Sequence, residues 1–599
     1  MIINDDKLKK VAKEGYIIDC ISGIEVKATP EEVEAVQIFC KQLLEDYEYP
    51  KSQIQTRPQF RVKARPSDTT KTYPVDIAVF KDGKKNDDEL FIIVECKKKN
   101  RKDGRTQLED YLRLSRAELG VWFNGEERLF LRKIEKNGRI LFDEIPNIPK
   151  NGQRVEDIGK FKKGEIQPRP THNLKAVFKA IRNHLAGNTV GTTRDEELAG
   201  QLINIIFCKL YDEKNTKLNE DIKFRAGVDE KDSDIKNRIL KIFEDVKRKT
   251  GGAIDKEDII KLDAKSVSYV VGELQNYSLM ETKRDVIADA FEVFIGHALK
   301  GGQGQFFTPR NVIKMMVKII DPNDDESIID PACGSGGFMI ETLKYVWKKI
   351  EIKGVERGWS KSDIEKEQRF YATEFIRGIE KDYFLSKVAK AYMTLVGDGT
   401  SGIFCEDSLD KPSNWNKKTQ LNVENGTFKI LLTNPPFGSK IPIKGNEKLK
   451  QYELGHKWKK SKKTLEWEKG KLKDKESPQV LFIERCLQLL DDGGRTAIVL
   501  PDGIFGNDKL GYIRQFISKN ARILAIIDIP KETFAPNTTT KTSILILKKS
   551  NKIEKDYPIF MAVCDKCGHD RRGKYIDEDD IKLVPEEFHN WKEQKNVEL

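Results

Sequence analysis

A glycine-rich stretch at 330–338, with the sequence DPACGSGGF, could bring the backbone into close contact with a ligand. The short run 327–329 before it is typical of a buried strand, and the apolar spacing after it is typical of a helix. Glycine allows positive φ and leaves no Cβ in the way of a ligand. The stretch matches neither the G-x-G-x-x-G fingerprint nor the phosphate-binding P-loop, so taken alone it is consistent with a tight turn as well as with a cofactor site.

A second motif, NPPF at 434–437, follows another run typical of a buried strand, 428–433. Together the two motifs resemble those of the amino-group DNA methyltransferases, specifically the N6-adenine methylase subunits of Type I restriction systems. The order matches that family too, because GQFFTP at 304–309 comes before the glycine-rich turn. The resemblance implies a Rossmann-like α/β catalytic domain that uses S-adenosylmethionine.

The resemblance also assigns cofactor-binding roles to residues of this chain. Glu380 stands where the family places the carboxylate for the cofactor ribose, and Asp407 stands where an acid meets the cofactor adenine. The expected cofactor-binding set is Gln305, Phe306, Phe307, Thr308, Asp330, Ala332, Gly334, Ser335, Gly336, Gly337, Glu380 and Asp407.

Methyl transfer is expected at the NPPF motif. Adenine N6 lies inside the duplex, so the target base must leave the stack. The side-chain oxygen of Asn434 and the carbonyl of Pro435 can then accept both N6 hydrogens, which frees the nitrogen lone pair for attack without a strong general base. Phe437 is placed to stack on the flipped ring. The expected catalytic residues here are Asn434, Pro435, Pro436 and Phe437, and NPPF favours adenine over cytosine N4 as the target.

Two acids and a lysine near the N-terminus could form a metal-dependent hydrolytic site. Asp76 lies in a strand-like run, 74–80, while Glu95 and Lys97 end the run 90–97. Period-2 alternation puts Glu95 and Lys97 on one face, and a hairpin connection lets the antiparallel neighbour bring Asp76 beside them. Two carboxylates suit Mg²⁺, and a lysine can stabilise the transition-state charge. We therefore expect Asp76 and Glu95 as metal ligands and Lys97 as a catalytic residue.

This arrangement resembles the PD-(D/E)xK nuclease fold at the N-terminus of Type I restriction subunits. Gln107 and Tyr111 match the Q-x-x-x-Y helix that follows the core there, and an i, i+4 pair can turn both side chains toward the metal site. The first-helix glutamate of the family is Glu31, Glu32 or Glu34. An edge hairpin with a salt bridge is the alternative, although two acids among apolar neighbours are costly without a cation.

The apolar patterns predict an α/β multidomain protein. Residues 1–150 are expected to form the nuclease-like domain. Prolines at 146, 149, 168 and 170, with several glycines and lysines, are typical of an interdomain linker, which we expect at 151–172. Helical spacing over 173–300 resembles the helical N-terminal domain of the same methylase subunits. From 301 to 599, alternating strands and helices indicate a doubly wound sheet with its site at the carboxyl ends of the strands.

Composition narrows the class of protein. With 599 residues, 38% of them hydrophobic and 34% charged, the chain is expected to be globular with several cores. No apolar run is long enough to span a bilayer, and residues 1–6 lack the features of a signal peptide, so we expect a cytoplasmic protein without a membrane partner. The nine cysteines are expected to be free thiols. Cys564, Cys567 and His569 lack a second zinc-ligand pair, which favours a hairpin turn over a metal site.

The net charge of +11 is concentrated after the NPPF motif. Residues 440–475 hold thirteen lysines and five acids, together with Tyr452, Trp458 and Trp467. Such a segment is either a solvated, mobile insertion or an arm that contacts DNA phosphates beside the target base.

The absence of certain motifs bears on partners. No Walker A sequence is present, so the chain is not expected to be the ATP-driven translocase of a Type I system. Only about fifty residues of the sequence follow the last predicted strand, 542–547, so a sequence-reading domain is not expected in this segment. The whole-chain pattern resembles the A subunits of Type IIB restriction–modification systems. The resemblance implies a hetero-oligomer in which a separate specificity subunit reads the target sequence. This chain would then methylate double-stranded DNA and cleave unmodified DNA with Mg²⁺. The alternative is a methylase whose N-terminal domain only docks partners or clamps DNA.

Overall fold

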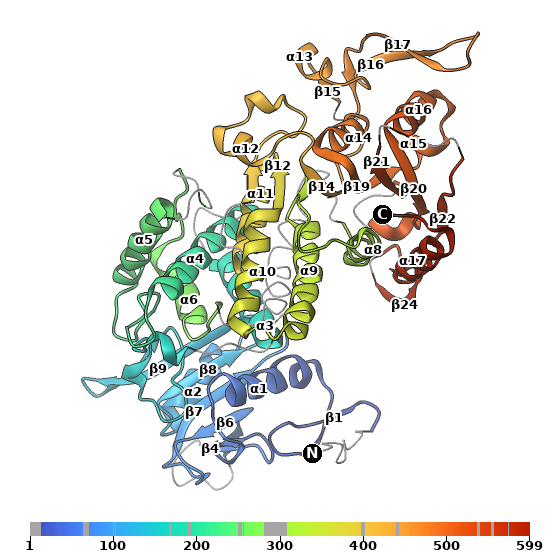
Figure 1. The fold of residues 1–599 in the computed structure, drawn as a ribbon. Coiled ribbons are helices and arrows are strands. Elements are labelled where there is room, and N and C mark those ends of the chain that lie inside the picture. Colours follow the sequence, from blue (N-terminus) through green and yellow to red (C-terminus); the bar gives the residue numbers. More distant parts are fainter. Residues whose placement is uncertain are drawn as a thin grey trace. The chain divides into compact units, whose positions relative to one another are not determined.

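The computed structural model describes residues 13–63, 71–99, 101, 103–166, 171–188, 194–249, 254, 257–280, 308–396, 402–438, 442–535, 540–550, 552, 556–572 and 574–599. The chain divides into two compact units, one comprising 1–249 and 256–298, the other 250–255 and 299–599 (Figure 1). The predicted cofactor residues Gln305, Phe306 and Phe307 lie outside the described residues. Within the described ranges, no helix combines the length and apolar character needed to cross a membrane.

The first unit is built on a six-stranded sheet with the order β10-β9-β8-β7-β6-β3. The central strands β6 (Ile77–Phe80) and β7 (Leu90–Cys96) pair antiparallel, and β7 pairs parallel with β8 (Leu119–Phe123) through the crossover helix α2 (Arg105–Leu114). The outer strands are β3 (Ile54–Gln55), β9 (Arg128–Lys136) and β10 (Arg139–Glu144). The predicted strand 74–80 is interrupted, because β5 (Thr72–Pro74) belongs to a separate hairpin with β4 (Arg61–Lys63).

Helices cover both faces of this sheet. The predicted first helix forms as a π-helical turn, η1 (Glu32–Val36), that continues into α1 (Gln37–Glu45). Ile77 and Ile92 pack in the core that contains α1, whereas Ala78 and Ile93 pack in the core that contains α2. By the same alternation, Asp76 and Glu95 face the α2 side of the sheet.

The stretch 151–166 is not a solvated linker, contrary to the sequence expectation. It forms two short 3-10 turns, η3 (Val155–Asp157) and η4 (Lys163–Glu165). Val155 and Ile158 belong to the core beneath α1, and their apolar side chains explain why the chain folds back despite its many charged and glycine residues. The helices α3 (Thr171–Asn188), α4 (Asp195–Asn215), α5 (Asp232–Lys249) and α6 (Ala264–Leu274) follow in the same unit.

Helix α6 packs directly on the N-terminal sheet. The guanidinium of Arg128 on β9 forms a buried ion pair with Glu273 on α6 and donates a second hydrogen bond to Gln42 Oε1 at 3.2 Å. The Asn147 amide donates to the carbonyl of Gly272 at 3.0 Å. The predicted boundary between a nuclease-like domain and a helical domain therefore falls inside one compact unit.

The second unit is built on an eight-stranded sheet with the order β13-β12-β11-β14-β19-β21-β20-β22. The strands are β11 (Ile328–Asp330), β12 (Ile376–Glu380), β13 (Ile403–Cys405), β14 (Phe428–Thr433), β19 (Leu490–Pro501), β20 (Ala521–Asp528), β21 (Thr542–Lys549) and β22 (Phe560–Val563). Its pairs are parallel except those of β21, which is antiparallel to β19 and β20.

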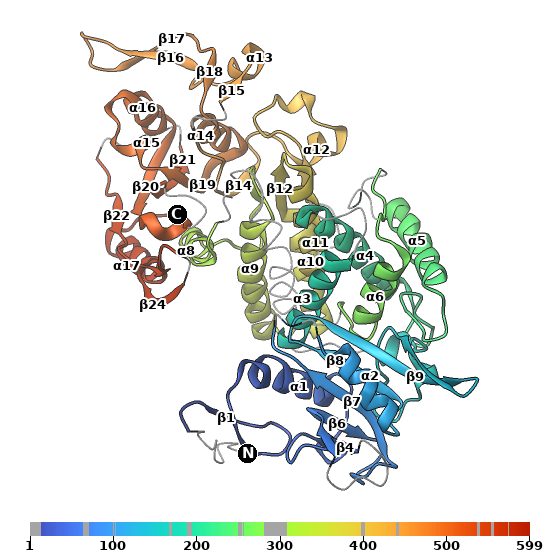
Figure 2. The ribbon, with the colours of Figure 1, turned by 180° about the vertical axis from the view of Figure 1, so that it is seen from behind.

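The helices of this unit alternate with the strands as the sequence predicts (Figure 2). They are α8 (Arg310–Ile320), α9 (Gly337–Glu356), α10 (Lys361–Phe375), α11 (Tyr383–Val396), α12 (Lys417–Asn422), α14 (Pro478–Leu489), α15 (Gly503–Gly506), α16 (Gly511–Asn520) and α17 (Val584–Lys595). The chain passes from β11 outward to β12 and β13 and then returns to β14 on the other side. The carboxyl ends of β11 and β14 therefore form a topological switch point, the usual ligand position in such sheets.

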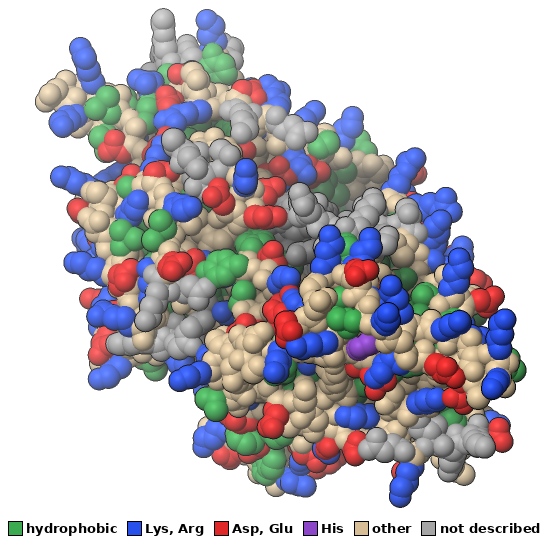
Figure 3. Space-filling model, turned by 90° about the horizontal axis from the view of Figure 1, so that it is seen from above, with side chains coloured by type: hydrophobic (Ala, Val, Ile, Leu, Met, Phe, Trp, Pro, Cys, Tyr) green, Lys and Arg blue, Asp and Glu red, His purple; other side chains and the backbone are tan. Residues whose placement is uncertain are grey.

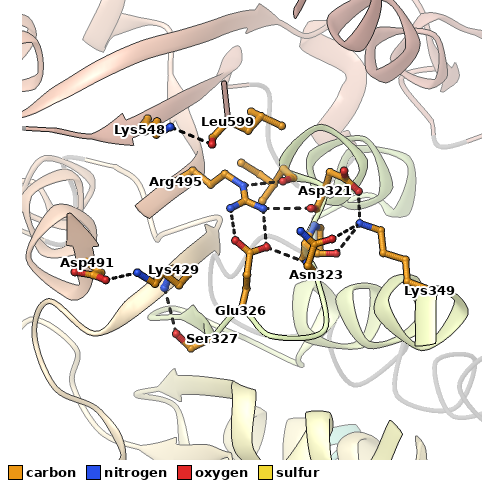
Figure 4. Close-up of polar contacts among 12 residues, drawn as sticks. Asp321, Asn323, Glu326, Ser327, Lys349, Lys429, Asp491, Arg495, Lys548 and Leu599 are labelled. Carbon is orange, nitrogen blue, oxygen red and sulfur yellow. Dashed lines mark hydrogen bonds and ion pairs between the residues drawn. The ribbon is translucent and has the colours of Figure 1, made fainter. Parts of the chain in front are cut away.

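Arg495, in the middle of β19, fixes the chain where it enters β11 (Figure 4). Its guanidinium donates to the carbonyls of Ile320 at 2.8 Å and Asp321 at 3.2 Å, and it pairs with both carboxylate oxygens of Glu326. Lys349 on α9 contacts Asp321 from the other side at 2.5 Å. This cluster joins the end of α8, the start of β11 and the helix that follows the glycine-rich turn.

The lysine-rich insertion is folded over its described part, 442–475. It contains a two-stranded stem, β15 (Ile443–Lys444) with β18 (Lys475–Glu476), a short helix α13 (Asn446–Leu449), and a hairpin of β16 (His456–Lys460) and β17 (Trp467–Leu472). A second hairpin, β23 (Cys567–His569) with β24 (Tyr575–Asp579), lies where the sequence predicts a turn. All nine cysteines are free, and the described residues contain no group of three or more His, Cys, Asp or Glu suited to a metal ion.

Candidate functional site

The glycine-rich turn connects β11 to α9 at the switch point. Gly334 and Gly336 have φ angles of 53° and 91°, which is the region that favours glycine. A Cβ on Gly334 would meet no atom within 4 Å, so the space beside it is open to a ligand. By contrast, a Cβ on Gly378, in the neighbouring strand, would lie 2.5 Å from Met339 Sδ. Glycine at 378 therefore lets α9 pack closely against the sheet and hold the turn in position.

Glu380, at the end of β12, is hydrogen-bonded to this turn. Its Oε2 accepts from the amide of Gly334 at 2.8 Å, and its Oε1 accepts from the amide of Asp382 at 2.8 Å. Burial raises the pKa of Glu380 above its ordinary value, although the backbone hydrogen bonds oppose this effect. The carboxylate that the sequence assigns to the cofactor ribose thus lies beside the open glycine.

Asp407, the acid expected to meet the cofactor adenine, is held by two lysines. Its Oδ2 accepts hydrogen bonds from Lys381 and Lys448, both at 2.8 Å. Burial alone would raise the pKa of Asp407, but the hydrogen bonds from these lysines bring it below its ordinary value. Lys448 belongs to α13 of the insertion and also pairs with Asp410 at 2.8 Å. Sequence reasoning missed Lys448, because nothing distinguishes it from the other lysines of that segment.

Asn434 follows directly after β14, and Thr308 fixes its side chain. The Asn434 amide nitrogen donates to the hydroxyl of Thr308 at 2.9 Å. The amide oxygen is buried and has no hydrogen-bond partner among the described residues. Thr308 was expected to bind the cofactor, whereas its described contact is with Asn434. The arrangement therefore leaves Asn434 Oδ1 as a hydrogen-bond acceptor without a donor among the described residues.

The rest of the NPPF motif and one missed residue complete this end of the sheet. Pro435 is buried, Pro436 is exposed and Phe437 is half-buried. The ring of Phe437 lies edge-on to that of Phe534, with their centroids 6.4 Å apart. Sequence reasoning did not single out Phe534; its place shortly after β20 was the available signal.

Asp330 joins the two motif-bearing strands. Its Oδ1 accepts from the hydroxyl of Thr433 at 2.7 Å and from the amide of Ala332 at 3.0 Å. Burial raises the pKa of Asp330 to about 7. Ser335, in the same turn, is also buried. In the described structure Asp330 therefore holds the end of β11 against the end of β14, beside the positions expected to touch the cofactor.

In the first unit, the structure brings Asp76, Glu95 and Lys97 together. Ile77 pairs with Val94, so Asp76 stands next to Glu95 across the antiparallel pair. Asp76 Oδ2 accepts from the amide of Cys96 at 2.7 Å, and the Lys97 ammonium contacts Glu95 Oε1. Burial raises the pKa of Asp76 to about 6, and burial together with the charge of Asp76 raises the pKa of Glu95 to about 7.

Gln107 and Tyr111 on α2 extend this cluster. The Lys97 ammonium donates to Gln107 Oε1 at 3.3 Å, and the Gln107 amide donates to the Tyr111 hydroxyl at 2.6 Å. The predicted helix therefore turns both side chains toward the acids.

The structure also separates the three candidate glutamates. The charge of Glu31 contributes to the raised pKa values of both Asp76 and Glu95. Glu32 is instead paired with Arg57 at 2.6 Å and accepts from Gln37. Of the three candidate glutamates, Glu31 is thus the one whose charge acts on both Asp76 and Glu95.

Both halves of the chain match known families. Residues 282–598 match the family described as N-6 DNA Methylase. Residues 30–149 match the family described as Type I restriction enzyme R protein N terminus. The second match ends before helices α3 to α6 and covers the sheet that carries Asp76 and Glu95.

Curated relatives agree with these matches. The EcoEI methylase subunit of a Type I restriction enzyme from Escherichia coli is 26% identical over 411 residues, which cover 63% of this chain and 75% of that protein. The Type II restriction enzyme and methyltransferase RM.BcgI from Heyndrickxia coagulans is 25% identical over 266 residues, 44% of this chain and 34% of that protein.

Among solved structures, a chain from a study of complex assembly and conformational transition in the type I R-M system matches with a TM-score of 0.50 at 16% identity. The match covers 69% of this chain and 82% of that one, and it shows a shared fold. Because its family match spans more than half of the residues and contains both motifs of the switch point, this chain belongs to the N-6 DNA methylase family.

Proposed function

We propose that this chain transfers a methyl group from S-adenosylmethionine to adenine N6 in double-stranded DNA, as the modification subunit of a restriction–modification complex. The observation that carries the proposal is the buried Asn434 Oδ1, which has no partner among the described residues. A buried acceptor without a donor is costly, and the amino group of a flipped adenine would supply one.

The residues around the switch point fit the cofactor. The open space beside Gly334 admits a ligand next to the backbone, and Glu380 offers a carboxylate for two ribose hydroxyls. Asp407, ionised between two lysines, is an acceptor for the adenine amine. When bound, S-adenosylmethionine supplies an electrophilic methyl group.

The protein's own groups would then orient the target amine. Asn434 Oδ1 and the Pro435 carbonyl accept the two N6 hydrogens, which turns the nitrogen lone pair outward. Thr308 holds the Asn434 amide so that its oxygen, and not its nitrogen, is presented. Phe437 offers a face for the flipped ring, and Phe534 buttresses Phe437. No proton has to leave before attack, so the site needs no general base.

The target sequence would be read by a separate specificity subunit in a hetero-oligomer. The relatives named as methylase subunits support this assignment, since a subunit acts in a larger complex.

For the first unit we propose Mg²⁺-dependent cleavage of unmodified DNA. Burial raises the pKa of both carboxyls, and the charge of Asp76 raises the pKa of Glu95 further; a divalent cation between the two would relieve this cost, which supports Asp76 and Glu95 as its ligands. The cation would supply Lewis acidity at the scissile phosphate. Lys97, oriented by Glu95 and Gln107, would stabilise the developing charge. The likeness to RM.BcgI, which combines restriction with methylation, supports the pairing of activities. A docking or DNA-clamping module without cleavage is the alternative.

Two assays of the complex with its specificity subunit test these proposals. Asn434→Ala should abolish methylation and leave S-adenosylmethionine binding intact by calorimetry. A parallel loss of cofactor binding would contradict the division of roles. In the second assay, unmethylated DNA and Mg²⁺ are added to the complex in the presence and in the absence of ATP. The DNA should be cut even in the absence of ATP. Glu95→Ala should abolish this cleavage, while methylation continues. Cleavage that persists in Glu95→Ala would place the nuclease elsewhere, and no cleavage with any divalent cation would favour the docking module.

A further inference from the structure

We propose that the hairpin β16–β17 is a preformed arm that grips the phosphate backbone of duplex DNA beside the flipped base. This inference rests on the proposed DNA methylation and assigns a substrate contact to a segment that no catalytic role uses. Four features of the segment support this inference: its stem lies next to the NPPF motif, buried contacts hold it to the catalytic unit, most of its lysines form no ion pair within the described residues, and the hairpin is exposed.

The arm starts and ends next to the catalytic motif. The chain leaves β14 through Asn434, enters the insertion, and returns through β18 to the first turn of α14. The stem of β15 and β18 closes the insertion, with Ile443 opposite Glu476. Gly438, just after the NPPF motif, donates its amide to Gln479 on α14 at 3.3 Å. The insertion therefore rises from the same end of the sheet as Asn434.

Buried contacts fix the lower part of the insertion to the catalytic unit. Tyr452 is fully buried, donates its hydroxyl to the carbonyl of Leu409 at 3.0 Å, and accepts from the guanidinium of Arg485 at 2.7 Å. Leu449 packs in the same small core as Tyr452. The insertion is thus a built part of the domain and not a solvated loop.

The hairpin itself is seated on α16 by its two tryptophans. The ring of Trp458 stacks on Tyr512 with 6.0 Å between centroids, and Trp467 meets the same ring edge-on at 5.9 Å. The backbone of Trp467 also exchanges two hydrogen bonds of 2.7 Å with the side chain of Gln515. Because both tryptophans serve as anchors, they are not free to stack on nucleic-acid bases, and the contact with DNA falls to the lysines.

The lysines of the hairpin are exposed, and most have no acidic partner. Lys469 lies 4.0 Å from Glu453, and Glu466 at the tip pairs with Lys519 of α16. Within the described ranges, no ion pair is formed by Lys457, Lys459, Lys460, Lys462, Lys463 or Lys471, all of which are exposed. Although Glu468 stands opposite Lys459 in the hairpin, lysines outnumber acids there and most form no ion pair in the described structure. Such concentrated cations on a folded support are suited to a polyanion, since little loop order remains to be lost on binding.

The hairpin projects from the catalytic unit beyond α14 and α16 in both ribbon views. Many Lys and Arg side chains, with Asp and Glu among them, lie on the face seen in Figure 3, which is the face that bears the hairpin at the top of Figure 1. A duplex that presents its flipped base to Asn434 would extend along this side. The geometry therefore favours backbone contacts, which position DNA without reading its sequence.

The test measures binding of the full chain to a labelled duplex of mixed sequence over a range of salt concentrations. The arm variant combines Lys457→Ala, Lys459→Ala and Lys462→Ala. A matched control removes three exposed lysines, without ion pairs in the described structure, from α9, α10 and α17: Lys348→Ala, Lys361→Ala and Lys595→Ala. The arm variant should lower the slope of log K against log salt by about 2–3 and weaken binding roughly 10- to 100-fold at 0.1 M salt. The control should retain the wild-type slope, and Lys→Arg at the three arm positions should restore it.

Equal slopes for the arm variant and the wild type would overturn the inference. So would an arm variant that binds DNA normally but no longer captures the specificity subunit, because the arm would then be a protein-docking surface. S-adenosylmethionine binding, measured on the same samples, confirms that each variant is folded. The proposed function is judged separately, by whether the wild-type complex methylates adenine at saturating DNA; that result does not alter the comparison of salt slopes.

Discussion

The amide nitrogen of Asn434 donates a hydrogen bond of 2.9 Å to the hydroxyl of Thr308, a residue 126 positions earlier in the chain. An asparagine side chain can present either its oxygen or its nitrogen to a ligand, and here the bond to Thr308 engages the nitrogen and leaves the oxygen without a partner among the described residues. The orientation of the proposed acceptor therefore depends on a residue outside the NPPF motif.

Thr308→Val should lower kcat for methylation roughly tenfold or more, because valine keeps the shape but cannot accept the hydrogen bond that orients Asn434. Thr308→Ser should retain most of the activity. Steady-state kinetics with calorimetric measurement of S-adenosylmethionine affinity would separate the effects. If Thr308→Val weakened cofactor binding and left kcat unchanged, Thr308 would belong to the cofactor site, as the sequence suggested.

Lys448→Ala should weaken S-adenosylmethionine binding by about an order of magnitude, because Asp407 would lose one of its two charged hydrogen bonds. Lys450→Ala is the matched control, since Lys450 is exposed and pairs only locally with Glu447. Calorimetric titration of both variants makes the comparison. Equal affinities in the two variants would show that the insertion does not support the cofactor site.

Mg²⁺ should bind the first unit more tightly as the pH rises from about 6 to 8, because Asp76 and Glu95 must lose protons that they hold with pKa values of about 6 and 7. Calorimetry in buffers of different ionisation enthalpy should detect proton release on binding. Glu95→Gln should abolish most of the binding and its pH dependence. Affinity that does not change with pH would mean that these acids are not the ligands.

The same shifts predict the pH dependence of stability without metal. Both folded pKa values lie above the ordinary values of 3.8 and 4.5. The two groups therefore contribute stability that is complete below about pH 4 and is lost as the pH rises through 6 to 7. Urea unfolding of the metal-free protein should show a loss over this interval that is smaller in Glu95→Gln. An equal loss in that variant would assign the effect to other groups.

Strand patterns were sufficient to predict the local positions of the catalytic groups. Asn434 follows a run that forms β14, and alternation along β7 places Glu95 and Lys97 on one face. Contacts between distant segments were not predictable, because each depends on how separate elements pack. Lys448 reaches Asp407 from within a uniform lysine-rich segment, and Val155 is buried in a stretch whose prolines and charges indicated a linker.

Arg128→Met and Glu273→Leu should each destabilise the first unit by about 3–5 kcal/mol, since each leaves a buried charge without its partner. The double variant should recover much of this loss, because it buries no unpaired charge. Denaturant unfolding of the three proteins measures the coupling. Additive losses in the double variant would show that the two residues stabilise the fold independently.

The packing of α6 on the N-terminal sheet also determines how far the Asp76–Glu95 pair can reach. Helices α3 and α5 both contact α6, and α6 is bound to the sheet, so a protein that binds these helices also sets the location of the acids. The distance from such a bound partner to the Asp76–Glu95 pair would be fixed by the packing of the unit and would not vary as it would across a flexible linker. Glycines inserted between 151 and 166 would disturb the core around Val155 and would not lengthen the reach.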